Sequence, residues 1–512
     1  MSSLASAKAA LTFLICLMIA VLLGYLLADP LTFSTMVWGA AILGVLSFPL
    51  LLQWHHRLLI ITWNASVILV FLPGELPLWI QVAFISLGIS ILSSTLVRDR
   101  NFLKVPSLTL PILFLAAVFL VTAKLTGGIG LRSVGSATFG GRRIFLLFGA
   151  VAGYFALTGE RIPKGREMLY GSLFFLSGLL AAVGILIYVA PEIFGVLAFF
   201  FPVGVAGEEA SPFGDSIGIV RLSGLSSVGE YLIFFLLARY GIRGMLLPVR
   251  LWRVALFVVG LGFSLLGGFR SLLVLILMLL AIQFYLEKLH RTHLVLVVLL
   301  SCGLAFTILA PFAEHLPFPI QRALSFLPVK VNTDVLEDAK TSTEWRIGMW
   351  KQLLPEVPHY LLLGKGFNID PSELYMANEA LRRGWAKNWE QSLIVGNYHS
   401  GPLSLIIPFG IFGVLGFIWF IVAALQFLNR NYKFGEARLR NFNTFLLALF
   451  ITRIFQFLFV FGAFENDLAN FFGLVGLGVA LNGGMARRAP AAASIETTNP
   501  LRSRSVPALG AT

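Results

Sequence analysis

Three arginines and one histidine stand in this sequence where such side chains are costly unless they have a role. They lie at the ends of apolar runs or on a polar stretch between them: Arg221, Arg270, Arg346 and His399. Arginine binds phosphate through a planar, permanently charged fork. A histidine near neutral pH can take a proton from a hydroxyl. Together these residue types suit the binding of a diphosphate and the activation of an acceptor hydroxyl.

Each position also has an ordinary explanation. Arg221 could snorkel to lipid headgroups, Arg346 could be a solvated surface residue, and His399 could lie at the membrane interface without a role. Arg270 fits such an explanation less well, because it lies on the predicted outer side in a turn too short to let its side chain wander. No single residue is sufficient evidence, but the combination favours a site for a lipid-linked diphosphate at the outer membrane face.

The composition predicts the elements that must position these residues. Of the 512 residues, 58% are hydrophobic and 12% are charged, whereas soluble proteins carry about 25% charged residues. Apolar runs approach the roughly 20 residues that a helix needs to cross a bilayer. We therefore predict an all-α, polytopic integral membrane protein with about fourteen transmembrane helices (twelve to fourteen). The net charge of +13 fits basic cytoplasmic loops, and it gives little reason to expect nucleic acid as a partner.

The predicted spans follow from the apolar runs. They are residues 11–28, 31–52, 58–73, 77–97, 105–123, 144–158, 168–190, 228–240, 254–269, 271–287, 294–312, 401–428, 442–462 and 466–482. Lysine and arginine concentrate in alternate connections, which places both termini in the cytoplasm. One predicted external loop, residues 124–143, breaks this pattern because it holds four cations and no acid. Either the neighbouring spans are misplaced, or these cations meet lipid phosphates, or they face an anionic ligand.

The pattern divides the chain into four parts. These are the N-terminal transmembrane helices 1–312 with an outer segment 191–227, a large outer helical loop 313–400, the C-terminal transmembrane helices 401–485, and a disordered cytoplasmic tail 486–512. Within the large loop, Thr341-Ser-Thr-Glu344 has the spacing of a capping box and predicts a helix start. Asp370-Pro371 predicts a second start, and Gly384 predicts the end of that helix.

In their order along the chain, several of these pieces resemble the O-antigen ligase/polymerase superfamily of bacterial envelope glycosyltransferases. The resemblance covers roughly residues 215–480. It rests on Arg221-Leu-Ser-Gly224, Gly267-Gly-Phe-Arg270-Ser271, Trp345-Arg346-Ile-Gly-Met-Trp350, Leu363-Gly364-Lys-Gly366, and His399-Ser400 followed by Gly410, Gly413 and Gly416. Two places depart from the usual pattern. The Arg270 turn reads Gly-Phe-Arg where a Ser-Arg pair is more usual, and Ser400 stands where asparagine is common.

The resemblance implies a metal-independent, inverting glycosyltransferase that needs no cofactor. It would move a glycan from undecaprenyl diphosphate to a hydroxyl on lipid A-core, another glycan or a protein. By position, His399 would be the catalytic histidine, and Arg221, Arg270 and Arg346 would bind the donor diphosphate. The same resemblance implies a multi-pass protein of the bacterial inner membrane, surrounded by membrane lipids, with its active site at the periplasmic face under the large loop.

Other functions stay open from the residues alone. An O-antigen ligase, a polysaccharide polymerase and a protein O-oligosaccharyltransferase share this chemistry and differ in the acceptor. A transporter or flippase would need ionisable residues inside the spans and repeated halves. We see no internal repeat and no P-loop motif, and the notable polar pair within a predicted span is Arg453 with Gln456. A structural scaffold would not need three outer arginines and a histidine.

Overall fold

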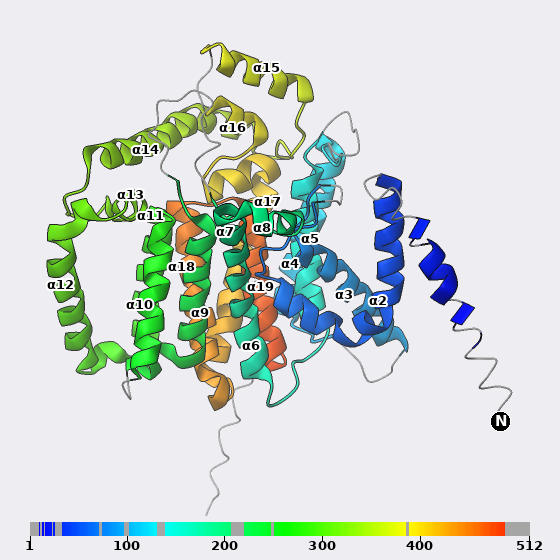
Figure 1. Ribbon diagram of the computed structural model, residues 1–512, viewed down its shortest axis with the longest axis horizontal. Coiled ribbons are helices and arrows are strands. Elements are labelled where there is room, and N and C mark those ends of the chain that lie inside the picture. The colour runs from blue at the N-terminus through cyan, green and yellow to red at the C-terminus, as the bar shows by residue number, and fades with distance from the viewer. Residues whose placement is uncertain are drawn as a thin grey trace, which may run out of the picture.

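The protein was analysed as a computed structural model, which describes residues 10, 13–14, 16–22, 24–25, 33–70, 74–96, 102–130, 139–205, 220–246, 250–385 and 389–486. This part of the chain is all-helical, with isolated β-bridges and no strand (Figure 1). It contains 7 helices that are long and apolar enough to cross a membrane. An all-helical, polytopic membrane protein is therefore confirmed, whereas the count of about fourteen spans is not and stays a prediction.

The helices of the bundle form from the apolar runs, and the helices of the large loop lie between α12 and α17 in the sequence. The bundle comprises α2 (Phe33–Thr62), α3 (Leu78–Leu96), α4 (Pro106–Thr126), α5 (Gly141–Leu157), α6 (Glu167–Leu176), α7 (Ala182–Val189), α9 (Ser223–Leu246), α10 (Leu251–Leu266), α11 (Arg270–Leu286), α12 (Leu294–Phe312), α17 (Gly401–Phe434), α18 (Arg440–Phe455) and α19 (Phe464–Asn482). The short helix α8 (Pro191–Phe194) follows α7. The large loop holds α13 (Phe318–Leu324), α14 (Thr333–Leu353), α15 (Pro371–Arg382) and α16 (Glu390–Val395).

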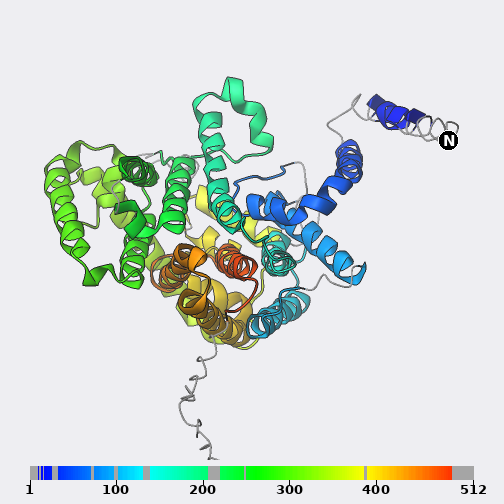
Figure 2. The same cartoon turned by 90° about the horizontal axis from the view of Figure 1, so that it is seen from below.

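The core of the bundle surrounds α18 and α19. These two helices lie among the others when the molecule is seen from below (Figure 2), with α19 packed on α5 and α18 packed on α9 and α11. Phenylalanine rings fill this core, and Phe420, Phe450 and Phe472 are fully buried. At the other extreme, α12 has no buried residue. Such an apolar, uncovered helix is expected where lipid is the solvent.

The structure corrects the predicted turn between residues 31–52 and 58–73. One helix, α2, continues through this region and ends at Thr62, although Pro49 lies inside it. The polar residues that suggested a turn are satisfied within the fold: His55 Nδ1 is 2.9 Å from Ser86 Oγ, and His56 Nε2 is 2.9 Å from the carbonyl oxygen of Leu157. After α2 the chain continues without a helix as far as residue 70. As far as residue 70, the predicted third span is therefore a helix end followed by an irregular segment.

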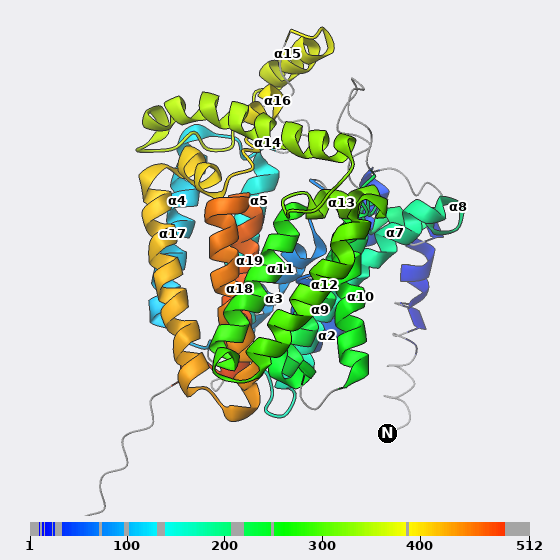
Figure 3. The same cartoon turned by 90° about the vertical axis from the view of Figure 1, so that its left-hand side faces the viewer.

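The large loop lies across one end of the bundle (Figure 3). Its first long helix, α14, begins at Thr333, and its N-cap, Asn332, lies nine residues before the N-cap at Thr341 that the capping box predicts. That prediction is wrong because the side chain of Asn332 caps the helix by accepting from the amide of Asp334. The start of α15 after Asp370, whose carboxylate accepts from the amide of Ser372, is confirmed. Gly384, in the left-handed region at φ +71°, follows the end of α15 as predicted.

A glycine-rich contact fixes the large loop to α17. Gly364 and Gly366, which flank Lys365, both have positive φ. The amides of Lys365 and Gly366 donate to the carbonyl oxygens of Ile407 and Pro408 at 2.7 and 3.0 Å. A Cβ on Gly364 would lie 2.0 Å from the Pro408 oxygen, so the close approach requires glycine. This contact holds the beginning of α17, and with it the residues just before α17, against the loop.

Several predictions fall outside the described residues. They are most of residues 191–227 beyond position 205, most of the first predicted span, Arg132 of the basic loop and nearly all of the tail 486–512. Nothing in the structure tests the proposed division into four parts, which stays a prediction.

Candidate active site

The four residues singled out in the sequence come from four different elements at one end of the bundle. Arg221 lies two residues before α9, Arg270 is the first residue of α11, Arg346 lies on α14, and His399 lies two residues before α17. In Figure 3, α14 crosses above the upper ends of these bundle helices. The structure therefore brings together residues that are far apart in the sequence, although nothing in it tests their roles.

An ion pair that the sequence analysis missed organises this cluster. Arg322 of α13 is only 5% exposed, and its Nε lies 2.5 Å from Asp338 Oδ2 on α14. Its Nη1 also donates to the carbonyl oxygen of Gly268 at 2.7 Å. Arg322 therefore ties α13 to both α14 and the Gly267–Gly268 turn. A buried guanidinium that is paired with a carboxylate and bonded to a backbone carbonyl holds the surrounding elements together, which favours a structural role for Arg322.

The other carboxylate oxygen of Asp338 faces Arg221. Arg221 Nη2 lies 4.0 Å from Asp338 Oδ1, and its Nε is buried without a hydrogen-bond partner among the described residues. Burial is the largest influence on Arg221 and lowers its pKa to about 10, and the charge of Arg322 acts in the same direction. Because a guanidinium with that pKa still carries its charge at neutral pH, Arg221 offers an incompletely paired cation.

Arg270 is held against α14. Its Nη2 donates to the carbonyl oxygen of Ala339 at 3.0 Å and to Thr343 Oγ1 at 3.2 Å. Neither partner carries a charge, so the positive charge of Arg270 is oriented but not neutralised. The turn that places it needs Gly268, which has a φ of +65° and packs against Pro319. The sequence motif therefore has a structural reason as well as a candidate binding role.

Arg346 completes the set of cations. Its guanidinium carbon lies 5.8 Å from the ring centroid of Phe461. Burial is the main cause that lowers its pKa, followed by the charges of Arg270 and Arg322. Four arginines thus influence one another around Asp338, the one carboxylate that the described residues bring to this cluster. Such an excess of positive charge is unfavourable unless an anion binds there.

His399 lies beside this cluster, between two aromatic rings. The ring centroids of His399 and Trp345 are 5.1 Å apart in a T-shaped arrangement, and Phe461 lies 5.3 Å from His399 on another side. His399 Nδ1 is buried without a hydrogen-bond partner among the described residues. Burial and, to a smaller extent, the charge of Arg346 lower the pKa of His399 to about 4. The imidazole is therefore neutral at pH 7 and free to accept a proton.

The backbone holds His399 in a conformation that non-glycine residues rarely adopt. Its φ is +49°. The preceding residue, Tyr398, is buried, and its carbonyl oxygen accepts from Trp350 Nε1 at 2.8 Å. The following residues enter α17 at Gly401. A side chain fixed in this way from both sides is typical of functional sites, where local strain is maintained by the surrounding structure.

Another cation from the unusual basic loop supports the same segment. Arg143 Nε lies 3.2 Å from Glu465 Oε1, and its Nη1 donates to the carbonyl oxygen of Gly396 at 3.0 Å. Arg142 Nε donates to the carbonyl oxygen of Gly74. These bonds favour a structural explanation for both arginines, because their charges link loops at this end of the bundle.

Arg453, the charged residue inside a predicted span, also has partners. Its Nη2 lies 2.7 Å from Glu230 Oε1 on α9, and its Nη1 donates to Gln456 Oε1 at 3.1 Å. The sequence analysis noted Arg453 and Gln456 but missed Glu230, which the predicted span 228–240 contains near its start. A search for opposite charges inside predicted spans would have found it.

Comparison with known families now adds independent information. An O-antigen ligase family model matches residues 254–418. No curated protein matches the chain. The matched region runs from α10 into α17, and it contains Arg270, Arg346 and His399, whereas Arg221 precedes it. The resemblance to the O-antigen ligase/polymerase superfamily is thereby confirmed.

Proposed function

We propose that this chain, a membrane protein of the O-antigen ligase/polymerase superfamily through its residues 254–418, transfers a glycan from undecaprenyl diphosphate to an acceptor hydroxyl at the periplasmic face of the bacterial inner membrane. The observation that carries the proposal is the convergence of Arg221, Arg270 and Arg346 beside His399 at one end of the bundle. The three arginines suit the binding of a diphosphate, and the histidine suits the activation of a hydroxyl nucleophile.

The arginines act on the donor. Arg221, Arg270 and Arg346 bind the diphosphate, while Arg322 stays paired with Asp338 and keeps α13 and α14 in place. As the bond between the anomeric carbon and the diphosphate oxygen breaks, negative charge grows on the leaving diphosphate. Arginines already fixed in position stabilise this charge without reorganising. They thereby do the work for which other enzymes use a divalent ion.

His399 acts on the acceptor. Its neutral imidazole takes the proton of the acceptor hydroxyl while that oxygen attacks the anomeric carbon from the side opposite the diphosphate. One C–O bond forms as the other breaks, and the configuration at the anomeric carbon inverts. Binding of the diphosphate brings negative charge near His399, which raises the pKa of the imidazole from its low value and makes it a stronger base. The active site thus gains basicity when the donor is bound.

The identity of the acceptor decides which of three activities the protein has. Lipid A-core would make the protein a ligase, a growing glycan a polymerase, and a protein hydroxyl an oligosaccharyltransferase. The matched family favours the ligase. The experiment incubates the purified protein with an undecaprenyl-diphosphate glycan in EDTA, with lipid A-core or with further donor. We expect transfer to lipid A-core, and chain growth on the donor would make the protein a polymerase.

A matched pair of histidine variants tests the base. His399→Ala should lower turnover by about 10²–10⁴-fold, with the protein still inserted in the membrane. His359→Ala is the control, because His359 lies in the same loop with its side chain 71% exposed. Transfer at the wild-type rate by His399→Ala would remove the catalytic proposal. If folded wild-type protein with intact donor transfers glycan to none of the acceptors, the transporter alternative is favoured instead.

A further inference from the structure

One helix of the large loop, α14, contacts both halves of the candidate active site (Figure 3). On the side of the cations, it carries Arg346, and its Ala339 carbonyl oxygen accepts from Arg270. On the side of the base, the ring centroids of Trp345 and His399 are 5.1 Å apart. Because α14 is a single helix of 21 residues, it sets the separation between the cations and the base.

Trp350, near the end of the same helix, bonds to the peptide group that precedes His399. Its indole Nε1 donates to the carbonyl oxygen of Tyr398 at 2.8 Å. The φ angle of His399 is the rotation between this peptide group and the Cα of His399, so a bond that holds the carbonyl oxygen also restrains φ. That angle is +49°, a setting that is unfavourable for a residue with a Cβ. The indole therefore restrains the rotation that aims the imidazole.

The other contacts of this segment lie on either side of that peptide group. The carbonyl oxygen of Gly396, three residues before His399, accepts from an arginine of the basic loop. After His399 the chain enters α17 at Gly401. Between these fixed points, in the part of the chain that the structure describes, the donor to the carbonyl oxygen of Tyr398 is the indole of Trp350. The φ angle of His399 thus depends on this one bond more than on its neighbours.

Packing fixes the indole in turn. Trp350 lies against the buried side chains of a small core between the large loop and the beginning of α17, formed by Leu353, Tyr398, Leu403 and Ile407. A ring that is already ordered loses little side-chain freedom when it makes a hydrogen bond. The position of the N–H is therefore set by this core, and the N–H in turn sets the backbone before His399.

We propose that Trp350 is a positioning residue for His399: its indole N–H holds the carbonyl oxygen of Tyr398, keeps His399 in its strained backbone conformation and aims the imidazole at the acceptor hydroxyl. This inference rests on the proposed function for the direction in which the imidazole points. In-line transfer requires the base and the leaving diphosphate at a fixed separation. Trp350 and Arg346 lie four residues apart on one face of α14, so the same helix places both.

Loss of the N–H should let His399 leave its strained conformation. One hydrogen bond changes the ratio of two conformations by about 3–10-fold. An imidazole that moves out from between Trp345 and Phe461 is better hydrated, so its pKa rises toward the ordinary value. Those two rings are uncharged, and the charge that acts on His399 is that of Arg346. The midpoint of protonation should therefore move up by as much as about 0.5–1 pH unit, since tenfold corresponds to one unit.

The protonation of His399 can be measured without catalysis. Diethyl pyrocarbonate modifies the unprotonated imidazole, and His399 is partly exposed. Mass spectrometry of the peptide that contains His399 gives the rate of modification at each pH. Trp350→Phe removes the N–H together with part of the ring. Benzothienylalanine at position 350 keeps the shape of the two rings and has sulfur in place of the N–H, so it keeps the test informative if Trp350→Phe fails to fold. Both variants should raise the midpoint.

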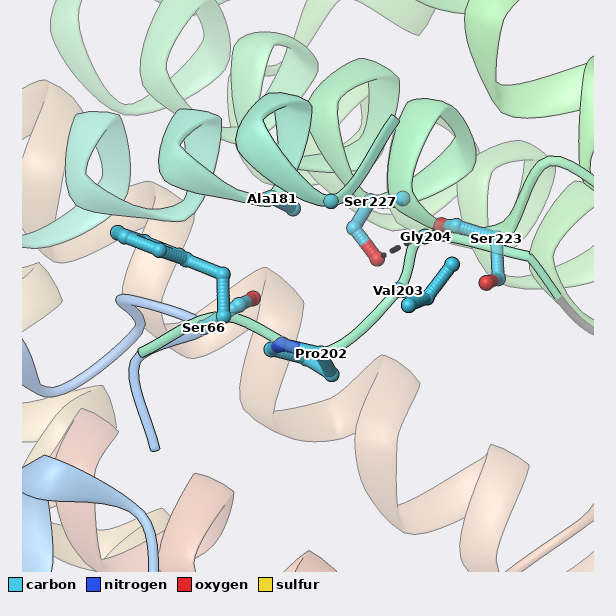
Figure 4. A pocket seen from close by; sticks show the side chains of 10 residues that line it. Ser66, Ala181, Pro202, Val203, Gly204, Ser223 and Ser227 are labelled. Atoms are coloured by element: carbon cyan, nitrogen blue, oxygen red, sulfur yellow. Dashed lines mark hydrogen bonds between the residues drawn. The ribbon is translucent and has the colours of Figure 1, made fainter. Parts of the chain in front are cut away.

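Two control variants match the parts of this change. Trp385→Phe shortens the same kind of side chain in the same loop, where Trp385 is 75% exposed. Ser227→Ala removes one hydrogen bond to a carbonyl oxygen at the same end of the bundle, because Ser227 Oγ donates to the oxygen of Ser223 at 3.1 Å in a pocket at the start of α9 (Figure 4). Both controls should keep the wild-type midpoint. An equal rise in either control would overturn the specific role of Trp350.

The outcomes separate this inference from the proposed function. An unchanged midpoint in both variants at position 350 would overturn the positioning role, even in a protein that transfers glycan. A raised midpoint in a protein without transfer activity would sustain the role and overturn the proposed function. In transfer assays, the variants should keep the KM for the donor and move the acidic limb of kcat/KM to higher pH. A raised KM for the donor with an unmoved limb would show that Trp350 supports the donor site instead of His399.

Discussion

The pH dependence of transfer should reveal how strongly the surroundings of His399 suppress its protonation. An ordinary histidine has a pKa near 6.5, whereas burial and the charge of Arg346 lower that of His399 to about 4. The difference is a roughly 300-fold weaker affinity for the proton. At pH 6 the imidazole of His399 should be about 99% neutral, compared with about 24% for an unperturbed histidine.

The direction in which activity changes with pH follows from the role of His399 as a base. A general base works only when it is unprotonated, so activity falls as the pH drops through its pKa. Because kcat/KM reports the free enzyme, we expect kcat/KM to stay level from neutral pH to about pH 5 and to decline near pH 4. The profile of kcat reports the donor-bound enzyme. Its acidic limb should lie at higher pH, since the bound diphosphate favours the protonated imidazole.

Two substitutions of Arg346 isolate the electrostatic cause. Arg346→Gln removes the charge that helps to lower the pKa of His399, so the acidic limb of kcat/KM should move to higher pH. Arg346→Lys keeps the charge and should leave the limb in place, even if it binds the donor less well than the forked guanidinium does. The comparison uses the shape of the profile, so a lower absolute rate in either variant does not affect it.

The assay is initial-rate transfer in detergent from pH 3.5 to 8, with aliquots returned to pH 7 to confirm that acid exposure is reversible. A wild-type limb of kcat/KM near pH 6.5 would refute the argument from burial. Limbs at the same pH in Arg346→Gln and Arg346→Lys would refute the argument from charge. His399→Ala should retain no limb at this pH, and a limb that persists there belongs to another group.

Three further substitutions test the parts of the site that hold charge. Arg270→Ala should weaken donor binding by about 10–100-fold, the value of a lost charged hydrogen bond, and an unchanged donor affinity would remove Arg270 from the diphosphate site. Asp338→Asn should destabilise the protein by about 3–5 kcal/mol because it leaves the buried Arg322 unpaired; thermal unfolding measures this, and an unchanged midpoint would show that the pair is not structural. Arg143→Ala and Glu465→Gln should lower the unfolding midpoint singly but add little in combination, whereas full additivity would indicate independent roles.

The sequence singled out four residues that the structure brings together, whereas it gave no signal for the residues that surround them. Arg270 could be singled out because a charge at a membrane boundary needs a reason. Arg322 and Asp338 carried no such signal, because they lie in a loop of mixed charges where most ions are solvated. Only the phase of α14 and the position of α13 bring their side chains together. Which residues converge is thus decided by the packing of helices that are distant in sequence.

Local patterns failed where a competing local interaction was stronger. The capping box at Thr341 has the right spacing, but Asn332 caps α14 first, and Thr343 turns its hydroxyl to the carbonyl oxygen of Ala339 inside the helix. The polar run before residue 58 resembled a turn, but His55 and His56 bond to neighbouring helices, so α2 continues. Both errors arise because a polar residue within a helix is acceptable when the surrounding fold supplies its partner.

The transporter alternative depended on Arg453, and the structure weakens that alternative because Arg453 has partners. Arg453 and Glu230 are 15% and 16% exposed and 2.7 Å apart, so the pair is neutral as a unit and joins α18 to α9. A transport site has to offer unsatisfied charge to a substrate and release it again, which a guanidinium bound to Glu230 and Gln456 does not do. At the end of the bundle, by contrast, Arg221 shares Asp338 with Arg322, and no carboxylate of the described residues forms an ion pair with Arg270 or Arg346. Fixed cations beside a neutral histidine suit a reaction on a lipid diphosphate that stays at the membrane surface. Glycan transfer therefore explains this arrangement better than transport across the membrane does.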